Sequence, residues 1–113
     1  MALQTIRRVL NPGGALVLHL GSPVFHAEQV RALSQTLKAT FAQVACYGTY
    51  VPLYGAYWGM AVCSDSLQPT AVSAAQIDER LAARGVTDLQ YYNADIHGAL
   101  FALPNYYRKL VLA

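Results

Sequence analysis

The sequence predicts an α/β fold with a mixed sheet whose last two strands form an antiparallel pair. A nearly continuous apolar run, Ala15–Leu20, lies between two segments with helical periodicity. Two further strand candidates, Gln43–Val51 and Tyr57–Ser64, are separated by a loop that is too short for a parallel crossover. The rest of the chain returns to helical patterns, and this order of helices and strands is typical of the α/β class.

The elements before the strand pair are predicted from periodicity and from residues that end helices. Residues 1–10 are expected to be helical, because their apolar residues share one stripe and two arginines lie in the last turn, where they suit the helix dipole. The sequence NPGG at 11–14 ends this helix. The strand Ala15–Leu20 is expected to be buried on both faces, as in a parallel sheet. From His26 to Thr40, the apolar spacing predicts a helix with one buried face.

After the strand pair the chain is predicted to be helical. Ser73 begins a helix, because a glutamine three residues later completes a capping box, and Gly85 is placed to end it. Asn93 is a good N-cap for a short helix over residues 94–102. A proline then leads into a last helix, which runs almost to the end of the sequence.

The composition excludes several classes of protein. The 113 residues allow one domain, and a hydrophobic content of 55% excludes intrinsic disorder. A net charge of +2 with scattered basic residues gives no basic patch for nucleic acid. No apolar stretch reaches the roughly 18 residues of a membrane span, and Arg7 and Arg8 interrupt the place of a signal peptide's apolar region. We therefore expect a cytoplasmic protein without a nucleic-acid or membrane partner, in which Cys46 and Cys63 are buried thiols.

The scarcity of charge is unusual for a chain of this size. Charged residues make up only 12% of the sequence, whereas a typical soluble domain has about 25%. A small domain also has a large surface relative to its volume and needs polar residues to cover it. We therefore expect that much of the surface meets a partner, or that the chain is part of a larger fold.

Candidate binding residues lie in two loops. Ligands of open α/β sheets bind outside the carboxyl ends of strands, which points to residues 19–22. The second place is the loop 52–58, because aromatic rings with polar tips can wall a small-ligand pocket. The same side chains, Tyr54, Tyr57 and Trp58, would also serve simply to cap the core, and both interpretations stay open.

The residues alone indicate no catalytic or metal-binding motif. The sequence contains no phosphate loop, no dinucleotide fingerprint and no nucleophile elbow. Its histidines are far apart and have no accompanying carboxylate motif, so each is interpreted first as a structural residue. These histidines are His19, His26 and His97.

The end of the chain, however, resembles a known enzyme family. Residues 91–104 read YYNADIHGALFALP and match, position by position, the pattern YYN-x-x-x-H-x-x-x-F-x-LP that closes the spermidine synthases, the polyamine aminopropyltransferases. The segment VPLY at 51–54, followed by Trp58, and the segment 21–26 resemble the same family. The NPGG turn before an apolar strand is similar to the late part of the class I S-adenosylmethionine-dependent transferase fold. The resemblance implies the C-terminal half of that Rossmann-like fold, with residues 1–113 forming a partial catalytic domain.

The resemblance also implies a reaction in polyamine biosynthesis and an acceptor site. The family transfers an aminopropyl group from the co-substrate decarboxylated S-adenosylmethionine to putrescine, which gives spermidine and methylthioadenosine without a metal or another cofactor. Tyr54 is similar to the family's acceptor-site tyrosine, and Trp58 matches a bulky apolar wall of that pocket. His19 stands where the family often has a glutamine that faces the acceptor amine. Asn93 and His97 match the tail motif and are interpreted as structural pins.

Departures from the family pattern limit what this chain is expected to do alone. Gly21 stands where the family often has an acidic residue, so the identity of the acceptor amine stays open. The family's N-terminal β-domain, donor loop and catalytic aspartates correspond to segments upstream of residue 1. We therefore assign no catalytic residue within this chain and expect it to be inactive alone. Its expected partners are a polyamine acceptor and either further copies in a homo-oligomer or the missing N-terminal half.

Two alternative interpretations remain at this point. One is the C-terminal half of an S-adenosylmethionine-dependent methyltransferase. It would have the same fold, and the likeness of the Tyr54 loop and the tail motif to the spermidine synthases would then be a coincidence. The other is a non-enzymatic remnant that keeps the ancestry of the family but binds a partner or has no activity.

Overall fold

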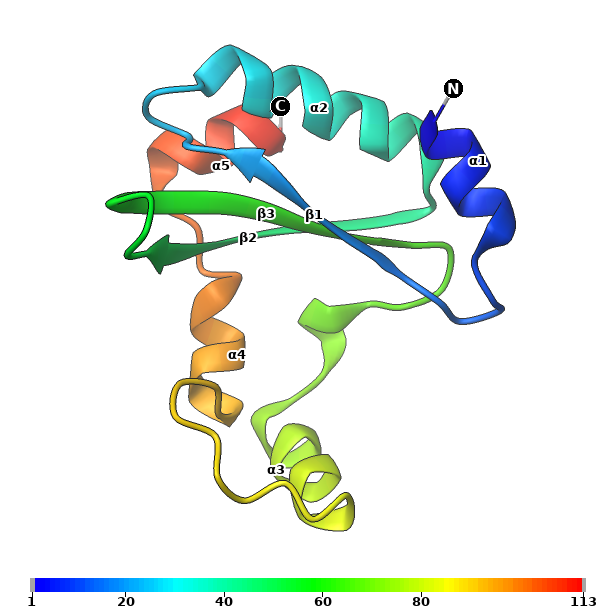
Figure 1. The fold of residues 1–113 in the computed structure, drawn as a ribbon, viewed down its shortest axis with the longest axis vertical. Coiled ribbons are helices and arrows are strands. Elements are labelled where there is room, and N and C mark those ends of the chain that lie inside the picture. Colours follow the sequence, from blue (N-terminus) through cyan, green and yellow to red (C-terminus); the bar gives the residue numbers. More distant parts are fainter. Residues whose placement is uncertain (1, 113) are drawn as a thin grey trace.

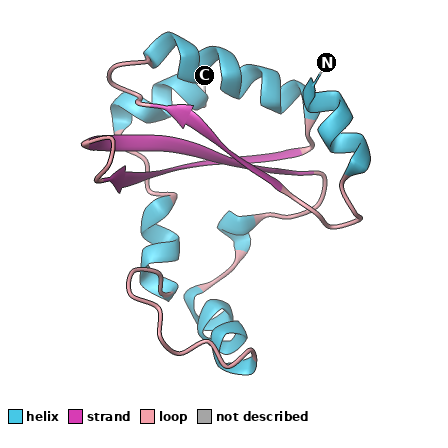
Figure 2. Cartoon of the chain, in the orientation of Figure 1, coloured by secondary structure: helices cyan, strands magenta, loops and turns pink. Residues whose placement is uncertain are grey.

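The computed structural model describes residues 2–112 and places helices on both sides of a three-stranded sheet (Figure 1). The strands are β1 (Leu16–Gly21), β2 (Gln43–Val51) and β3 (Ala56–Ser64). The α-helices are α1 (Ala2–Val9), α2 (Ala27–Thr40), α3 (Ala74–Ala83), α4 (Ala94–Leu100) and α5 (Asn105–Val111), and a short 3-10 helix, η1, covers Pro69–Ala71. The predicted order of helices and strands is confirmed (Figure 2), and η1 is the addition that the sequence did not predict.

The sheet has the order β1-β3-β2, and β3 runs antiparallel to both neighbours. The predicted antiparallel pair of β2 and β3 is therefore confirmed. Because α2 carries the chain back between them, β1 and β2 run in the same direction, but β3 lies between these two strands. Every pair of neighbouring strands within residues 2–112 is consequently antiparallel, so the parallel pairing of a mixed sheet is not made inside this range.

The prediction that β1 is buried on both faces is wrong for this chain. Burial alternates along the strand until its end, where Leu20 is fully buried. Val17 points to the opposite face and is 51% exposed. The reason is that α2 and α5 pack on one face of the sheet only, and no described segment covers the other face beside β1 (Figure 1).

The core lies between the sheet and the helices α2 and α5 (Figure 1). α2 contributes one stripe of apolar side chains, as its predicted spacing requires, and α5 contributes the aromatic and aliphatic residues of its inner face. The buried core residues are Leu20, Val30, Leu37, Phe41, Ala61, Cys63, Tyr107, Leu110 and Val111. This layer fixes the positions of the strand ends from which the candidate site is built.

Two tyrosine rings lie directly on the backbone of the sheet at positions where a glycine leaves room. A Cβ at Gly48 would overlap the ring of Tyr57, and a Cβ at Gly59 would lie 2.9 Å from the hydroxyl oxygen of Tyr107. The Tyr107 side chain is fully buried, and its hydroxyl donates a 2.9 Å hydrogen bond to the carbonyl of Tyr47. Burial raises the pKa of Tyr107 far above its ordinary value, so this hydroxyl keeps its proton.

The predicted N-terminal caps of α3 and α4 are confirmed, whereas α4 ends at Leu100 and not at the predicted residue 102. The Ser73 hydroxyl accepts from the Gln76 N–H, and the Gln76 side chain accepts from the Ser73 N–H, which is the expected capping box. Gly85 follows α3 with φ +65°, the left-handed conformation that suits glycine after a helix. The side chain of Asn93 caps α4 by accepting from the Ile96 N–H at 2.8 Å.

The segment of residues 65–102, which we call the arm, extends from the sheet on the side opposite α2 (Figure 1). His97 holds the arm together, because its Nε2 lies 2.8 Å from the carbonyl oxygen of Pro69 and its Nδ1 lies 2.8 Å from the Tyr92 hydroxyl. A carbonyl only accepts, so Nε2 carries the proton and Nδ1 accepts from Tyr92. Asn93 and His97 thus act as the structural pins that the tail motif suggested.

Candidate functional site

The three predicted binding residues meet at one end of the sheet. The ring of Tyr54 stacks on that of Trp58, with centroids 4.2 Å apart and planes inclined by 29°. The His19 ring lies edge-on to both, with centroids 6.0 Å from Tyr54 and 6.5 Å from Trp58. The fold therefore brings together side chains from β1, from the β2–β3 turn and from β3, as the sequence interpretation requires.

The strand register explains why His19 and Trp58 are neighbours. His19 pairs with Met60 across the β1–β3 ladder. Trp58 lies two residues before Met60 on β3, so the two side chains point to the same face of the sheet. Trp58 is consequently a diagonal neighbour of His19, within reach of an aromatic side chain.

The turn between β2 and β3 positions the ring of Tyr54. The N–H of Tyr54 and that of Gly55 both donate to the carbonyl of Val51 at 3.0 Å. Gly55 has φ +63°, a backbone conformation that side-chain-bearing residues adopt at a cost. The tight turn folds Tyr54 back over β3, where it contacts Trp58.

The end of β1 carries a bulge that separates His19 from the core residue after it. The register shifts between His19 and Gly21, and Leu20 in the bulge is fully buried. Gly21 has φ +114°, and a Cβ there would lie 3.1 Å from the Nε2 of Gln29. That amide in turn donates to the carbonyl of Leu20 at 3.0 Å. An acidic side chain at position 21 would therefore strain this strand end.

His26 also joins the site, although the sequence did not predict it as a binding residue. Its ring lies edge-on to Trp58 at a centroid distance of 5.8 Å. The N–H of Ser22 donates to the Nδ1 of His26 at 3.1 Å, so the proton of the neutral imidazole is on Nε2. The Ser22 hydroxyl accepts from the N–H groups of Val24 and Phe25, which closes the turn. The feature of the sequence that could have indicated this contact is the break GSP at residues 21–23, directly after the strand.

Together these four residues, His19, His26, Tyr54 and Trp58, form what we call the aromatic cluster. Tyr54 is 46% exposed, and both histidines are exposed, so a ligand has access from solvent. The Nε1 of Trp58 is buried and has no hydrogen-bond partner among residues 2–112. No ion pair or hydrogen bond recorded for these residues brings a carboxylate to the cluster. The cluster offers aromatic faces and polar tips, which suit a cationic amine with an alkyl chain.

The other reactive groups of the described chain do not form a second centre. Burial raises the pKa of both thiols, that of Cys63 to about 11, so both stay protonated and are poor nucleophiles. Within residues 2–112, no three His, Cys, Asp or Glu side chains gather in a way that would hold a metal ion. None of the helices described is long and apolar enough to cross a membrane.

Comparison with known proteins identifies the family. The model of the spermine/spermidine synthase domain matches residues 2–74. The polyamine aminopropyltransferase of Nitrosomonas europaea is 43% identical over 105 residues, which cover 93% of this chain and 32% of that protein. The polyamine aminopropyltransferase of Sulfolobus acidocaldarius is 31% identical over 106 residues, which cover 94% of this chain and 35% of that protein. This chain thus spans about a third of the length of the curated relatives it matches.

Solved structures show the same fold. The spermidine synthase of Thermotoga maritima superposes with a TM-score of 0.82 at 21% identity, over 96% of this chain and 38% of that one. A spermidine synthase in complex with the transition state analogue AdoDATO gives a TM-score of 0.71, over 87% of this chain and 32% of that one. The chain therefore has the α/β fold of part of a spermidine synthase, as expected for the C-terminal half of a Rossmann-like class I S-adenosylmethionine-dependent transferase fold. With its domain match, its relatives and its fold in agreement, the chain belongs to the spermine/spermidine synthase family.

Proposed function

We propose that residues 1–113 are a partial catalytic domain, the acceptor-binding part of a polyamine aminopropyltransferase. The single observation that supports this most is the aromatic cluster, in which His19, Tyr54 and Trp58 meet although they come from separate elements. A methyltransferase whose methyl acceptor is not an amine would have no need of an amine-binding surface at this strand end. The relatives described above are named as polyamine aminopropyltransferases, which favours the same choice.

The acceptor in this proposal is a diamine such as putrescine. Its alkyl chain packs against the faces of Tyr54 and Trp58, and an ammonium end is attracted by the aromatic rings. The attacking amine must be unprotonated: its nitrogen forms a bond to the aminopropyl carbon, the bond from that carbon to sulfur breaks, and the nitrogen then loses a proton. Methylthioadenosine leaves with the electron pair of the broken bond. The cluster contributes binding and orientation to this displacement.

The proposal assigns neither the donor site nor the general base to this chain. The cluster contains no carboxylate, and decarboxylated S-adenosylmethionine would have to be held by residues other than these. We therefore expect the isolated chain to form no methylthioadenosine from decarboxylated S-adenosylmethionine and putrescine. Formation of that product by the purified chain would contradict this part of the proposal.

A chimeric enzyme tests the function directly. In it, this chain replaces the matching third of the Nitrosomonas europaea polyamine aminopropyltransferase, to which it is 43% identical. We expect the chimera to form methylthioadenosine from decarboxylated S-adenosylmethionine and putrescine. Tyr54→Ala and Trp58→Ala should each raise the KM for putrescine about tenfold or more. Tyr50→Ala, which removes a tyrosine that is 62% exposed and outside the cluster, serves as the matched control.

The outcomes separate the possible functions. A folded chimera that forms no methylthioadenosine would support the remnant interpretation and overturn the proposal. If the chimera is active but Tyr54→Ala leaves its KM for putrescine unchanged, the proposed reaction is supported and the proposed role of the cluster as acceptor site is overturned. Replacing putrescine by a longer diamine in the same assay determines which acceptor the chain prefers.

A further inference from the structure

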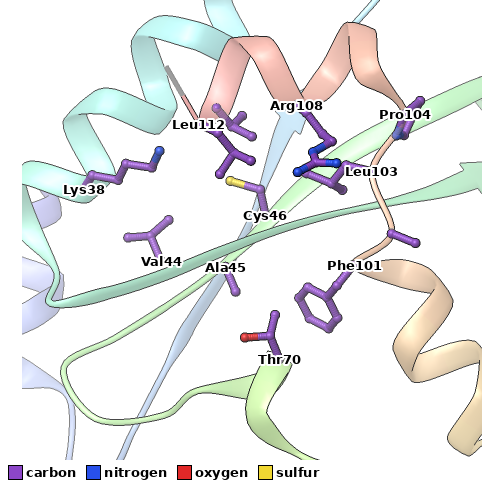
Figure 3. Close-up of a pocket in the computed structure, with 12 residues that line it drawn as sticks. Lys38, Val44, Ala45, Cys46, Thr70, Phe101, Leu103, Pro104, Arg108 and Leu112 are labelled. Atoms are coloured by element: carbon purple, nitrogen blue, oxygen red, sulfur yellow. The ribbon is translucent and has the colours of Figure 1, made fainter.

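A cavity that is unrelated to the aromatic cluster lies along the outer edge of β2 (Figure 3). We call it the β2 cleft; it has a volume of about 720 Å³. On the side of β2 that faces α2 and α5, its apolar lining includes Val44, Cys46 and Leu103, and it continues around the strand edge to Phe101 on the other side (Figure 3). The volume lies within the range of sites that hold small organic ligands. No member of the aromatic cluster lines it.

Two cationic side chains reach into the β2 cleft from different helices. Figure 3 shows Lys38 of α2 and Arg108 of α5 extending toward Cys46 from opposite sides. Burial raises the pKa of the Cys46 thiol, and the positive charge of Lys38 partly offsets that rise. The Lys38 charge therefore interacts with a group that lines the cleft. Neither cation has an ion-pair partner among residues 2–112.

Among residues 2–112, no carboxylate side chain balances these cations. None of the acidic side chains lines the β2 cleft. The acidic residues are Glu28, Asp65, Asp78, Glu79, Asp88 and Asp95. Other basic side chains also have no ion-pair partner within residues 2–112, but Lys38 and Arg108 are the two that line this cavity. A ligand that complements it must carry negative charge and an apolar body.

We propose that the β2 cleft is a binding site for a small organic acid, whose carboxylate lies between Lys38 and Arg108 and whose apolar body packs on Val44, Cys46 and Leu103. This goes beyond the proposed aminopropyl transfer, because the site shares no residue with the acceptor site and takes a ligand of opposite charge. A guanidinium and an ammonium both form charge-assisted hydrogen bonds to a carboxylate, and such bonds are about twice as strong as neutral ones.

A simpler explanation for the two cations makes a different prediction. Lys38 and Arg108 lie in the last turns of α2 and α5, where positive charge interacts favourably with the helix dipole. If that were their only role, the β2 cleft would have no preference between an anion and a cation with the same apolar body. Matched probes of opposite charge therefore distinguish the two explanations.

The test titrates the isotope-labelled full chain with 4-phenylbutyrate and, separately, with 4-phenylbutylamine, and follows backbone amide signals by NMR. We expect the anion to shift the amides of residues 44–46 and 101–103 and to bind about tenfold more tightly than the amine. The fluorescence of Trp58, the single tryptophan of the chain, should stay unchanged, because it reports on the aromatic cluster instead.

Variants assign the effect to the two cations. Lys38→Met and Arg108→Met should each weaken phenylbutyrate binding about tenfold. Lys109→Met, which removes an exposed neighbouring charge that does not line the β2 cleft, should leave binding within about twofold of the parent chain. Dispersed NMR spectra show that each variant is folded. Equal affinity for both probes, unchanged affinity in both lining variants, or shifts centred on Trp58 would each overturn the proposal.

Discussion

The rings of Tyr54 and Trp58 stack at a centroid distance of 4.2 Å, so one face of the indole is shielded by a turn residue. Because the chain has a single tryptophan, its fluorescence reports on the surroundings of this one indole, which include the Tyr54 ring. Tyr54→Ala should expose that face to water and shift the emission maximum to longer wavelength, whereas Tyr54→Phe should preserve the stack and the emission. An unchanged spectrum in the alanine variant would mean that the stack does not persist in solution.

Gly21 is predicted to be the most sensitive glycine near the site. Its φ of +114° and the Gln29 amide, 3.1 Å from a virtual Cβ, both oppose a side chain. Gly21→Ala should destabilise the fold by about 1–2 kcal/mol, and Gly21→Asp should do so by at least as much. Gly98→Ala is the control, since a Cβ in that helical position meets no atom within 4 Å, and it should stabilise the fold by up to about 1 kcal/mol. Urea unfolding measures all three, and equal stability of the Gly21 and Gly98 variants would refute the argument.

The hydroxyl of Tyr107 is predicted to contribute to stability through its buried hydrogen bond to the Tyr47 carbonyl. Tyr107→Phe keeps the ring over Gly59 but removes this hydrogen bond, which should cost about 0.5–1.5 kcal/mol in the free energy of unfolding. Tyr106→Phe, next to it and 41% exposed, should change stability by less than about 0.5 kcal/mol. A loss of similar size in both variants would show that the buried hydroxyl has no special role.

His97 is predicted to stabilise the arm without affecting the sheet. His97→Ala removes the contacts to the Pro69 carbonyl and the Tyr92 hydroxyl together. Backbone amides of α3 and α4 should then exchange hydrogen at least about tenfold faster, while those of β3 stay protected. Mass spectrometry of peptides from the two regions measures this. Faster exchange in β3 as well would indicate that the arm and the sheet unfold as one unit.

Asp65 is predicted to make stability depend on pH in the acid range. Hydrogen bonding to the Ala42 N–H, with the Arg7 guanidinium as the next cause, lowers the pKa of Asp65 below its ordinary value of 3.8. A lowered pKa in the folded state gives stability that is present above pH 3.8 and is lost as the pH falls through the folded-state value. Asp65→Asn should therefore destabilise the chain at pH 7 and make little difference at about pH 2. A difference between parent and variant that is the same at both pH values would refute this.

The elements with strong local signals were predictable from the sequence. The capping box at Ser73 and the N-cap at Asn93 depend on side chains within three residues of each other, and both form as expected. The strand pair followed from the short loop between two apolar runs. The burial of β1 was not predictable, because the sequence of a strand does not show that helices cover only one of its faces.

The candidate site was predictable in part. His19, Tyr54 and Trp58 were predicted from the resemblance. Their contact could not be predicted in the same way, because it depends on the β1–β3 register, which places His19 beside Trp58. His26 was missed, because its contact with Trp58 depends on the turn that the Ser22 backbone closes onto its ring. The β2 cleft was missed for a similar reason: Lys38 and Arg108 are far apart in the sequence, and only the packing of α2 and α5 brings them to one cavity.

Where a tyrosine ring lies on a glycine of the sheet, the effects of substitutions at the two positions are coupled. A side chain at Gly48 is compatible with this fold only if the Tyr57 ring moves away or becomes smaller, because the two would occupy the same volume. The single replacements should each be costly, and their combination should cost less than the sum. Positions 48 and 57 therefore have to change together, and a library that varies them independently would consist mostly of unstable chains.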